Sequence, residues 1–306
     1  MSAPAIIDPR AAWLKERRRY LGASDVAAVL GADPYRGPLA VYLSKVGEDD
    51  AAEKRWMRFG RLVEGAIAEG YREDTGRPVR DLGAHEIQVH PDVGFLAATL
   101  DRQTEGCDLS PAPAGGPGPL ECKAVAGMKA SDWKDEPPLH FQVQLMAQMA
   151  CTGAQWGSLC ALLGGVAIRW MDLQRHDAFL ARALPVLETF WLRVLRREPP
   201  EADGLPGTTM ALRALYAYED GETVTLDAEA LALVETMDAH KISRSAEDEV
   251  IESAENKLRA RMGQASFGAL PDGSLLTLRK IERGAYVVKA TSYRTLRRIR
   301  PRLRFR

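Results

Sequence analysis

Helix-like and strand-like patterns alternate along the first two thirds of this chain. Segments with the composition or the three- to four-residue apolar spacing of helices lie at 13–20, 51–75, 137–153 and 177–197. Short apolar runs bounded by turn-forming residues predict strands at 85–90, 95–100, 120–125, 156–163 and 167–173. Because alternation of this kind is typical of helices packed on a central sheet, we expect an α/β domain over residues 1–200.

The helix expected at 51–75 combines an apolar face with one badly placed acid. Apolar residues recur at Trp56, Phe59, Val63, Ile67 and Tyr71, which predicts a buried face. Glu64 lies beside that face rather than opposite it. A buried, unpaired carboxylate is costly, so we expect Glu64 to point into a cleft with a cation. The alternative is a surface ion pair with Arg58 or Arg61.

The sequence pattern of residues 201–306 differs from that of the preceding domain and predicts an accessory extension. A connector contains a short helical piece at 211–218 and leads to a long helix at 227–262. The apolar side of that helix is expected to include Leu231, Val234, Met237, Ile251 and Leu258. The turn Pro271-Asp272-Gly273-Ser274 then predicts a β-hairpin between 267–270 and 275–278.

Charge is balanced overall but unevenly distributed. The 306 residues include 41 basic and 42 acidic side chains, yet residues 279–306 alone contain eleven basic residues and one acid. The segment therefore carries +10, and the rest of the chain carries −11. Such asymmetry is typical of a polyanion-binding tail on an acidic body. A solvated basic tail without a partner is the alternative.

Several classes of protein are excluded by what the sequence contains. Four cysteines are too few for a disulfide framework, and Cys151 and Cys160 in an apolar stretch are expected to be buried. The histidines match no zinc-binding motif, and no glycine-rich nucleotide-phosphate loop occurs, so any metal should have oxygen ligands. Lacking a long apolar run or a signal-peptide pattern, the chain is expected to be cytoplasmic, away from any membrane.

The sharpest chemical signal is Glu121-Cys122-Lys123 in an expected strand. Side chains alternate along a strand, so Glu121 and Lys123 should project from one face and Cys122 from the other. The breaker-rich loop at 110–119 predicts a hairpin that brings Asp101 near Glu121. Two carboxylates and a lysine are what metal-assisted phosphodiester hydrolysis requires. Taken alone, a Glu and Lys pair on one strand face is most often a surface ion pair.

Two further segments carry candidate site residues. Ser24 or Asp25 is expected to cap a helix that continues through 26–30. Alternatively, Ser24 and an arginine from 17–19 hold a phosphate at the start of that helix. In the expected helix at 137–153, Gln144 and Gln148 share a face because they are four residues apart.

The order of these motifs resembles the PD-(D/E)XK nuclease fold, in its restriction-endonuclease-like form with a mixed central sheet flanked by helices. The motifs are Leu21–Gly31, the Phe59-Gly60 helix with Glu64, Ala98-Thr99-Leu100-Asp101, Leu120-Glu121-Cys122-Lys123, and Pro138-Leu139-His140 leading to Gln144 and Thr152-Gly153. Together they resemble the YqaJ viral recombinase family, which is similar to lambda-type exonuclease. The resemblance covers about 13–197, with Leu100 standing where the superfamily usually has proline.

The resemblance implies a set of site residues. Asp101, Glu121 and the backbone carbonyl of Cys122 would ligate Mg²⁺ or Mn²⁺, and Lys123 would act near the nucleophilic water. Glu64 and Gln144 would complete the catalytic set, with Gln142 and Gln148 as alternatives to Gln144. Arg17, with Arg18 and Arg19 as alternatives, and Ser24 would bind a substrate phosphate.

The resemblance also implies an activity. It implies a metal-dependent exonuclease that degrades linear double-stranded DNA from 5′ to 3′ and leaves 3′ single strands for homologous recombination. A ring-shaped homo-oligomer, a single-strand annealing recombinase as partner, and a phage or prophage origin in a bacterial host are implied as well. The alternatives are an endonuclease of restriction or repair type and a catalytically silent DNA-binding accessory protein.

Overall fold

The computed structural model describes residues 9–47, 55–83, 86–111, 113, 115–218, 221, 223–280, 282 and 296. The side chains of residues 9, 11, 55 and 56 are outside this description. The chain divides into two compact units, Met1–Ala214 and Leu215–Arg306, each treated by itself below. Most of the basic segment 279–306 lies outside the described residues, so the tail stays a prediction.

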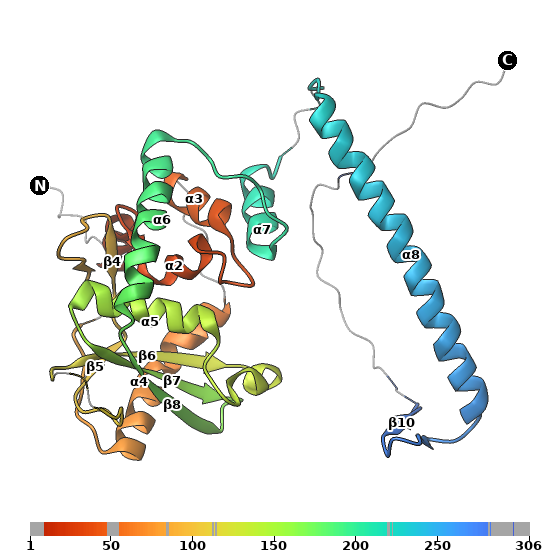
Figure 1. The fold of residues 1–306 in the computed structure, drawn as a ribbon, viewed down its shortest axis with the longest axis horizontal. Coiled ribbons are helices and arrows are strands. Elements are labelled where there is room, and N and C mark those ends of the chain that lie inside the picture. Colours follow the sequence, from red (N-terminus) through yellow and green to blue (C-terminus); the bar gives the residue numbers. More distant parts are fainter. Residues whose placement is uncertain are drawn as a thin grey trace, which may run out of the picture. The chain divides into compact units, whose positions relative to one another are not determined.

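A five-stranded mixed sheet lies at the centre of the first unit (Figure 1). Its strands follow the order β2-β5-β6-β7-β8. Their bounds are Val79–Arg80, Arg102–Thr104, Gly118–Val125, Trp156–Leu163 and Ala167–Gln174. Only β6 and β7 pair in parallel, with Glu121 opposite Leu159 and Cys122 opposite Cys160. The parallel pair requires a crossover, which α5 (Leu139–Thr152) provides.

Two helices cover opposite faces of this sheet (Figure 1). Ile67 and Tyr71 of α4 (Arg55–Thr75) pack on Cys122 and Cys160. On the other face, Leu145 and Met149 of α5 pack on Leu159 and Ala161, as does Trp133. The face with odd-numbered residues of β6, which includes Glu121 and Lys123, is therefore turned toward α5.

A second layer packs on the far side of α5. A small sheet has the order β1-β4-β3, with β1 (Leu21–Gly22) parallel to β4 (Leu96–Ala98) and β3 (Gln88–Val89) antiparallel to it. Around it lie α1 (Pro9–Arg17), α2 (Ala23–Val29), α3 (Pro38–Val46), α6 (Asp177–Arg196) and α7 (Pro206–Leu215). The largest hydrophobic cluster joins α2, α3, α5 and α6 with this small sheet.

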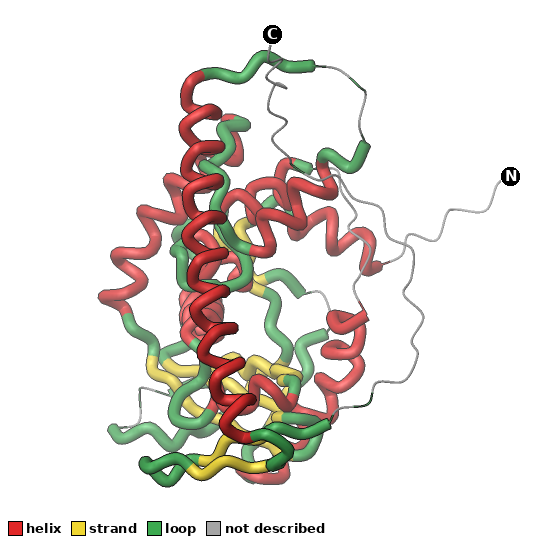
Figure 2. The backbone as a smooth tube through the Cα atoms, turned by 90° about the vertical axis from the view of Figure 1, so that its right-hand side faces the viewer, coloured by secondary structure: helices red, strands yellow, loops and turns green. Residues whose placement is uncertain are grey.

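The second unit contains α8 (Ala228–Met262), drawn as one uninterrupted helix in Figure 2, and a hairpin of β9 (Phe267–Ala269) and β10 (Leu275–Thr277). No described residue of α8 is buried. The apolar side expected for this helix is therefore not part of a core: Leu231 and Ile251 are exposed. Among the described helices, none is both long enough and apolar enough to cross a membrane.

Three local expectations differ from the structure. Phe59 is exposed, whereas Val63, Ile67 and Tyr71, further along the expected apolar face of α4, pack in the core. The hairpin loop at 110–119 connects β6 to β5 rather than to the strand at 95–100. The proline-started helix α3 was not expected from the sequence pattern, although Pro38 at its first turn is a helix-start signal.

Helix α2 is capped differently from the expectation. Its N-cap is Gly22, so neither Ser24 nor Asp25 holds that position. The Asp25 carboxylate nevertheless accepts a hydrogen bond from the backbone N–H of Gly22 at 3.2 Å, reaching back from inside the first turn. Ser24 is thereby left with its hydroxyl available to a different partner.

Candidate active site

The alternation of β6 places Glu121 and Lys123 together, as the sequence predicts. The Lys123 Nζ lies 2.5 Å from Glu121 Oε1, and Glu121 is 3% exposed. Burial alone would lower the pKa of Lys123, but the negative charges of Glu121 and Asp101 raise it above its ordinary value. The lysine is therefore held as a cation between two acids. Cys122 lies on the opposite face, in the cluster with α4.

Two glutamines of α5 meet Glu121 from above the sheet. Gln144 donates from Nε2 to Glu121 Oε1 at 2.7 Å and accepts from Lys123 Nζ at 3.1 Å. One turn later, Gln148 donates to Glu121 Oε2 at 2.5 Å and to the carbonyl of Thr99 at 3.5 Å. Gln142 instead donates to the carbonyl of Pro137. Of the three glutamines left open by the sequence, Gln144 and Gln148 therefore contact the acid.

Asp101 lies in the connection between β4 and β5 and reaches the middle of β6. Its Oδ2 accepts a hydrogen bond from the backbone N–H of Cys122 at 2.8 Å. Desolvation by the surrounding protein raises the pKa of Asp101 well above its ordinary value, and the nearby charge of Glu121 raises it further. Asp101 and Glu121 thus form a pair of acids that repel one another at the central strand of the sheet.

Glu64 points toward this pair and is itself paired with a cation. Arg102, the residue after Asp101, donates to Glu64 Oε1 at 2.7 Å and also to the carbonyl of Asp101. Desolvation raises the pKa of Glu64 despite Arg102, and Glu121 adds to the rise. The expected cleft cation is therefore Arg102 of β5, which the sequence analysis missed. Its position directly after Asp101 is the one signal that could have indicated it.

The residues at this site fit a hard divalent cation. Among the described residues, no three His, Cys, Asp or Glu side chains form a ready metal-binding group. Asp101 and Glu121 nevertheless offer the oxygen donors that Mg²⁺ and Mn²⁺ take. Beside them, Gln148 Oε1 is buried and has no hydrogen-bond partner. A cation here would offset the repulsion that raises the pKa of Asp101.

The residues expected to hold a phosphate come together at the start of α2. Arg17, at the end of α1, donates to the Ser24 hydroxyl at 2.5 Å, and its guanidinium lies over the ring of Trp13 at 5.2 Å. A Cβ added at Gly22 would be in ordinary contact with Arg17 Nη2 at 3.5 Å and in closer contact with Asp25 Oδ2 at 3.3 Å. The structure thus brings Arg17 and Ser24 into direct contact.

Asp25 gathers two more cations at the same place. Arg36 Nη1 lies 2.6 Å from one carboxylate oxygen and Lys45 Nζ 2.7 Å from the other. Burial would raise the pKa of Asp25, but Lys45, Arg36 and Arg17 together hold it far below its ordinary value. Three cations around one carboxylate leave positive charge in excess next to Ser24. The sequence analysis did not find Arg36 or Lys45.

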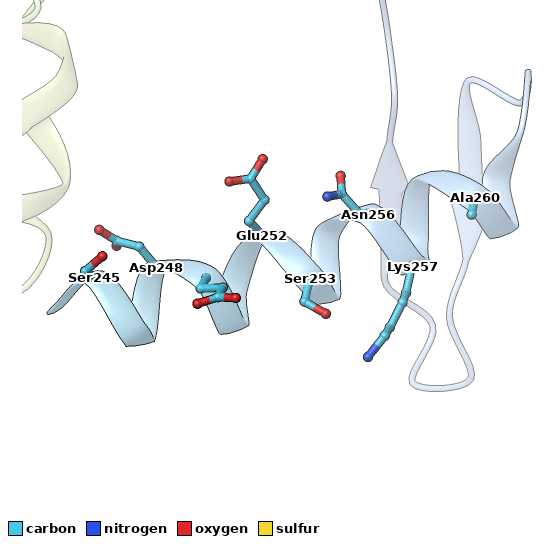
Figure 3. A pocket seen from close by; sticks show the side chains of 8 residues that line it. Ser245, Asp248, Glu252, Ser253, Asn256, Lys257 and Ala260 are labelled. Carbon is cyan, nitrogen blue, oxygen red and sulfur yellow. The ribbon is translucent and has the colours of Figure 1, made fainter. Parts of the chain in front are cut away.

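A surface hollow in the second unit is a poor site for chemistry. The side chains that line it, Asp248, Glu252 and Asn256 among them, all belong to α8 (Figure 3). They follow one another along a single helix, so no second element brings further groups toward them. The acids and amides that converge from several elements lie in the first unit.

Comparison with known proteins places this arrangement in a family. Residues 12–155 match the YqaJ-like viral recombinase domain. The uncharacterized protein YqaJ of Bacillus subtilis strain 168 is 26% identical over 263 residues, which covers 84% of this chain and 79% of that protein.

A solved structure shares the fold. The crystal structure of LHK-Exo in complex with dAMP matches with a TM-score of 0.50 at 20% identity, covering 61% of this chain and 94% of that one. A second crystal structure, of the alkaline exonuclease LHK-Exo from Laribacter hongkongensis, gives a TM-score of 0.47 at 20% identity and the same coverage. Residues 12–155 of this chain therefore match a YqaJ-like viral recombinase domain, as the motifs predicted, and the fold is of the PD-(D/E)XK type.

Proposed function

We propose that this protein is a divalent-metal-dependent DNA exonuclease. The observation that carries the proposal is the meeting of Asp101, Glu121 and Lys123, with Gln144 bonded to both members of the Glu121–Lys123 pair. A viral recombinase-like family and an alkaline exonuclease as structural neighbour both support a nuclease role. The chemistry of the site agrees, because phosphodiester hydrolysis requires acids, a cation and a positioned water at one point.

Each site residue has a proposed part in hydrolysis. Asp101, Glu121 and the carbonyl of Cys122 would hold Mg²⁺ or Mn²⁺, which when bound lowers the pKa of water and neutralises phosphate charge. Lys123, kept charged by its neighbours, orients the attacking water and stabilises the charge that develops on the phosphate. Gln144 keeps the side chains of Glu121 and Lys123 in position, because it is hydrogen-bonded to both. Glu64, held by its ion pair with Arg102, contributes a third carboxylate to the site.

The cation cluster at Ser24 is proposed to hold the 5′-terminal phosphate of the substrate. Arg17 is bonded there to a neutral hydroxyl, whereas Arg36 and Lys45 share the carboxylate of Asp25. Arg17 and the hydroxyl of Ser24 can therefore turn to a phosphate at low cost. The similar LHK-Exo was crystallised in complex with dAMP, a deoxynucleoside monophosphate. This arrangement supports the proposal that the enzyme cleaves from a phosphorylated 5′ end and releases mononucleotides.

The wider setting rests on the family. We infer that the enzyme acts on linear double-stranded DNA in phage-type homologous recombination and supplies 3′ single strands to an annealing recombinase. A ring-shaped homo-oligomer, a phage or prophage origin and a bacterial cytoplasmic location belong to the same inference. Light scattering of the purified protein tests the ring, because a monomer in solution contradicts it.

End-labelled linear duplex, with and without a 5′-phosphate, tests the activity in Mg²⁺. Glu121→Ala and Lys123→Ala should each lower the rate of digestion by at least about 100-fold, the usual loss when one catalytic group is removed. Lys134→Ala removes an exposed lysine away from the acids and serves as the control. Circular dichroism establishes that each variant is folded.

The same assay separates the alternatives. Digestion of closed circular plasmid would replace the exonuclease with an endonuclease. Unchanged digestion of the linear duplex by both folded variants would overturn the catalytic assignment. DNA binding without digestion by the wild type in either metal would leave a catalytically silent accessory protein.

A further inference from the structure

A continuous row of aromatic contacts runs outward from the catalytic lysine. Lys123 Nζ lies 4.8 Å from the ring centroid of Phe141, whose ring lies 4.0 Å from that of His140. His140 in turn meets Tyr35 edge-on, at 6.1 Å and 89°. The row therefore begins at the proposed catalytic centre and ends at Tyr35, which is 49% exposed.

Tyr35 is held in place by its backbone as well as by contacts of its side chain with Lys129 and His140. Its N–H donates to Asp33 Oδ1 at 2.8 Å, and its carbonyl accepts from the N–H of Gly207 in α7 at 2.8 Å. Gly207 allows this contact, because a Cβ at that position would lie 2.8 Å from the Tyr35 carbonyl oxygen. The ring is thus presented on a fixed loop while nearly half of it faces solvent.

A lysine from a third element stands over this ring. Lys129 belongs to the 3₁₀ helix η1 (Gly127–Trp133), and its Nζ lies 5.9 Å from the Tyr35 centroid. The helix is anchored by Trp133, which is buried against α5 and whose carbonyl accepts from Arg169 at 2.8 Å. The Lys129 side chain is itself 57% exposed. Its Nζ also lies 3.7 Å from Asp132 Oδ2, so a fixed aromatic ring and an exposed, loosely paired cation lie side by side.

We propose that Tyr35 and Lys129 bind an unpaired nucleotide of the DNA strand that occupies the catalytic centre. Every base has an aromatic face that stacks on a tyrosine ring, and its phosphate pairs with a lysine at the same point. A paired base keeps its faces covered by its neighbours in the duplex, so the platform selects a separated strand. This proposal rests on the proposed nuclease function, which supplies the strand.

The charge of Lys129 and the unbroken row of rings from Lys123 favour DNA over an apolar partner at this surface. The row of rings leads to Lys123, so a strand lying on it points to the acids, and Lys129 supplies attraction to a phosphate. Packing of Tyr35 on His140 alone would explain the edge contact. It would not require a ring braced by two backbone hydrogen bonds and left open to solvent.

Binding of a fluorescent single-stranded oligonucleotide, measured by anisotropy in chelator so that no digestion occurs, tests the platform. Tyr35→Ala should raise the Kd by about 5- to 150-fold, the range reported for loss of one base–aromatic stack, whereas Tyr35→Trp should keep the wild-type value. Lys129→Ala should weaken binding and lower the salt slope by about one. Tyr218→Ala and Lys134→Ala remove an exposed tyrosine and lysine elsewhere and serve as matched controls.

The outcomes separate this inference from the nuclease proposal. An unchanged Kd in folded Tyr35→Ala, or an equal loss in Tyr218→Ala, overturns the platform whatever the activity of the wild type. Glu121→Ala should lose digestion yet bind the oligonucleotide like the wild type in chelator. If digestion is absent throughout while Tyr35→Ala still weakens binding, the nuclease proposal fails and the strand-binding site stands.

Discussion

Two aspartates in the first unit have opposite electrostatic surroundings. Asp25 is shared by Lys45 and Arg36 and lies near Arg17, and these cations hold its pKa far below the ordinary value. Asp101 faces Glu121 and Glu64 with Lys123 as the nearby cation, and its pKa is raised well above the ordinary value. Both are desolvated, so the difference comes from the charges around them.

In the Asp25 cluster the chain's own side chains neutralise the carboxylate. At Asp101 and Glu121 they leave negative charge that a bound cation would have to offset. The Asp25 cluster is neutralised by side chains of the chain and has positive charge to spare, which suits a phosphate. The Asp101 pair has more negative charge than its lysine can offset, which suits a divalent cation. We therefore propose that the first site receives an anion and that the second is completed by a divalent cation.

Removing each carboxylate should give the largest contrast. Asp25→Asn leaves Lys45 and Arg36 without their shared partner, and the free energy of unfolding should fall by about 3–5 kcal/mol, as for one-sided loss of a buried ion pair. Asp101→Asn removes a repelled charge and should leave that free energy unchanged or higher in chelator. Urea denaturation measures both. Equal losses in the two variants would show that the surroundings are alike.

Added Mg²⁺ should stabilise the protein through one aspartate only. At 100 times the Kd, a ligand that binds the folded state alone adds about 2.7 kcal/mol to the free energy of unfolding. Thermal denaturation of the wild type should therefore shift upward with Mg²⁺ concentration, and Asp101→Asn should lose the shift. Glu136→Asn, at an exposed acid outside the site, should keep it. Stabilisation that persists in Asp101→Asn would place the metal elsewhere.

The pH dependence of stability should have opposite signs at the two aspartates. Because the pKa of Asp25 is lowered, its contribution is complete above the ordinary value of 3.8 and is lost as pH falls below it. Because the pKa of Asp101 is raised, its folded state binds extra protons, and stability in chelator is lost as pH rises above 3.8.

Unfolding curves across this pH range check the two signs. The gap between wild type and Asp25→Asn should shrink on acidification, whereas the gain from Asp101→Asn should grow as pH rises. A gain from Asp101→Asn that is constant with pH would contradict the raised pKa of that carboxyl group.

The smallest effect is expected at Gln148, which ties the two acid-bearing segments together. Its amide donates to Glu121 and to the carbonyl of Thr99, two residues before Asp101. Gln148→Leu should reduce the stabilisation by Mg²⁺ by about 1 kcal/mol, the usual worth of one hydrogen bond, because the acids lose their spacing. Calorimetric titration with Mg²⁺ measures the change. Gln142→Leu, which leaves Glu121 untouched, is the control and should bind Mg²⁺ like the wild type.

The sequence indicated much of the fold because its signals are local. The periods of α4, α5 and α6 and the strands β6, β7 and β8 follow from spacing within each segment. Strand alternation placed Glu121 and Lys123 on one face, and this is confirmed by their contact. The motif order and the resemblance it carried predicted the fold and the meeting of Arg17 with Ser24.

What remained depended on contacts between distant segments. The pairing of Glu64 with Arg102, the choice of Gln144 and Gln148 over Gln142, and the cations around Asp25 each join residues from different elements. The exposure of Phe59 likewise does not follow from the helix period. A periodic pattern determines which side chains share a face, whereas only tertiary packing decides which residues that face contacts. Packing therefore also decides that Asp25 is surrounded by cations and Asp101 by other acids.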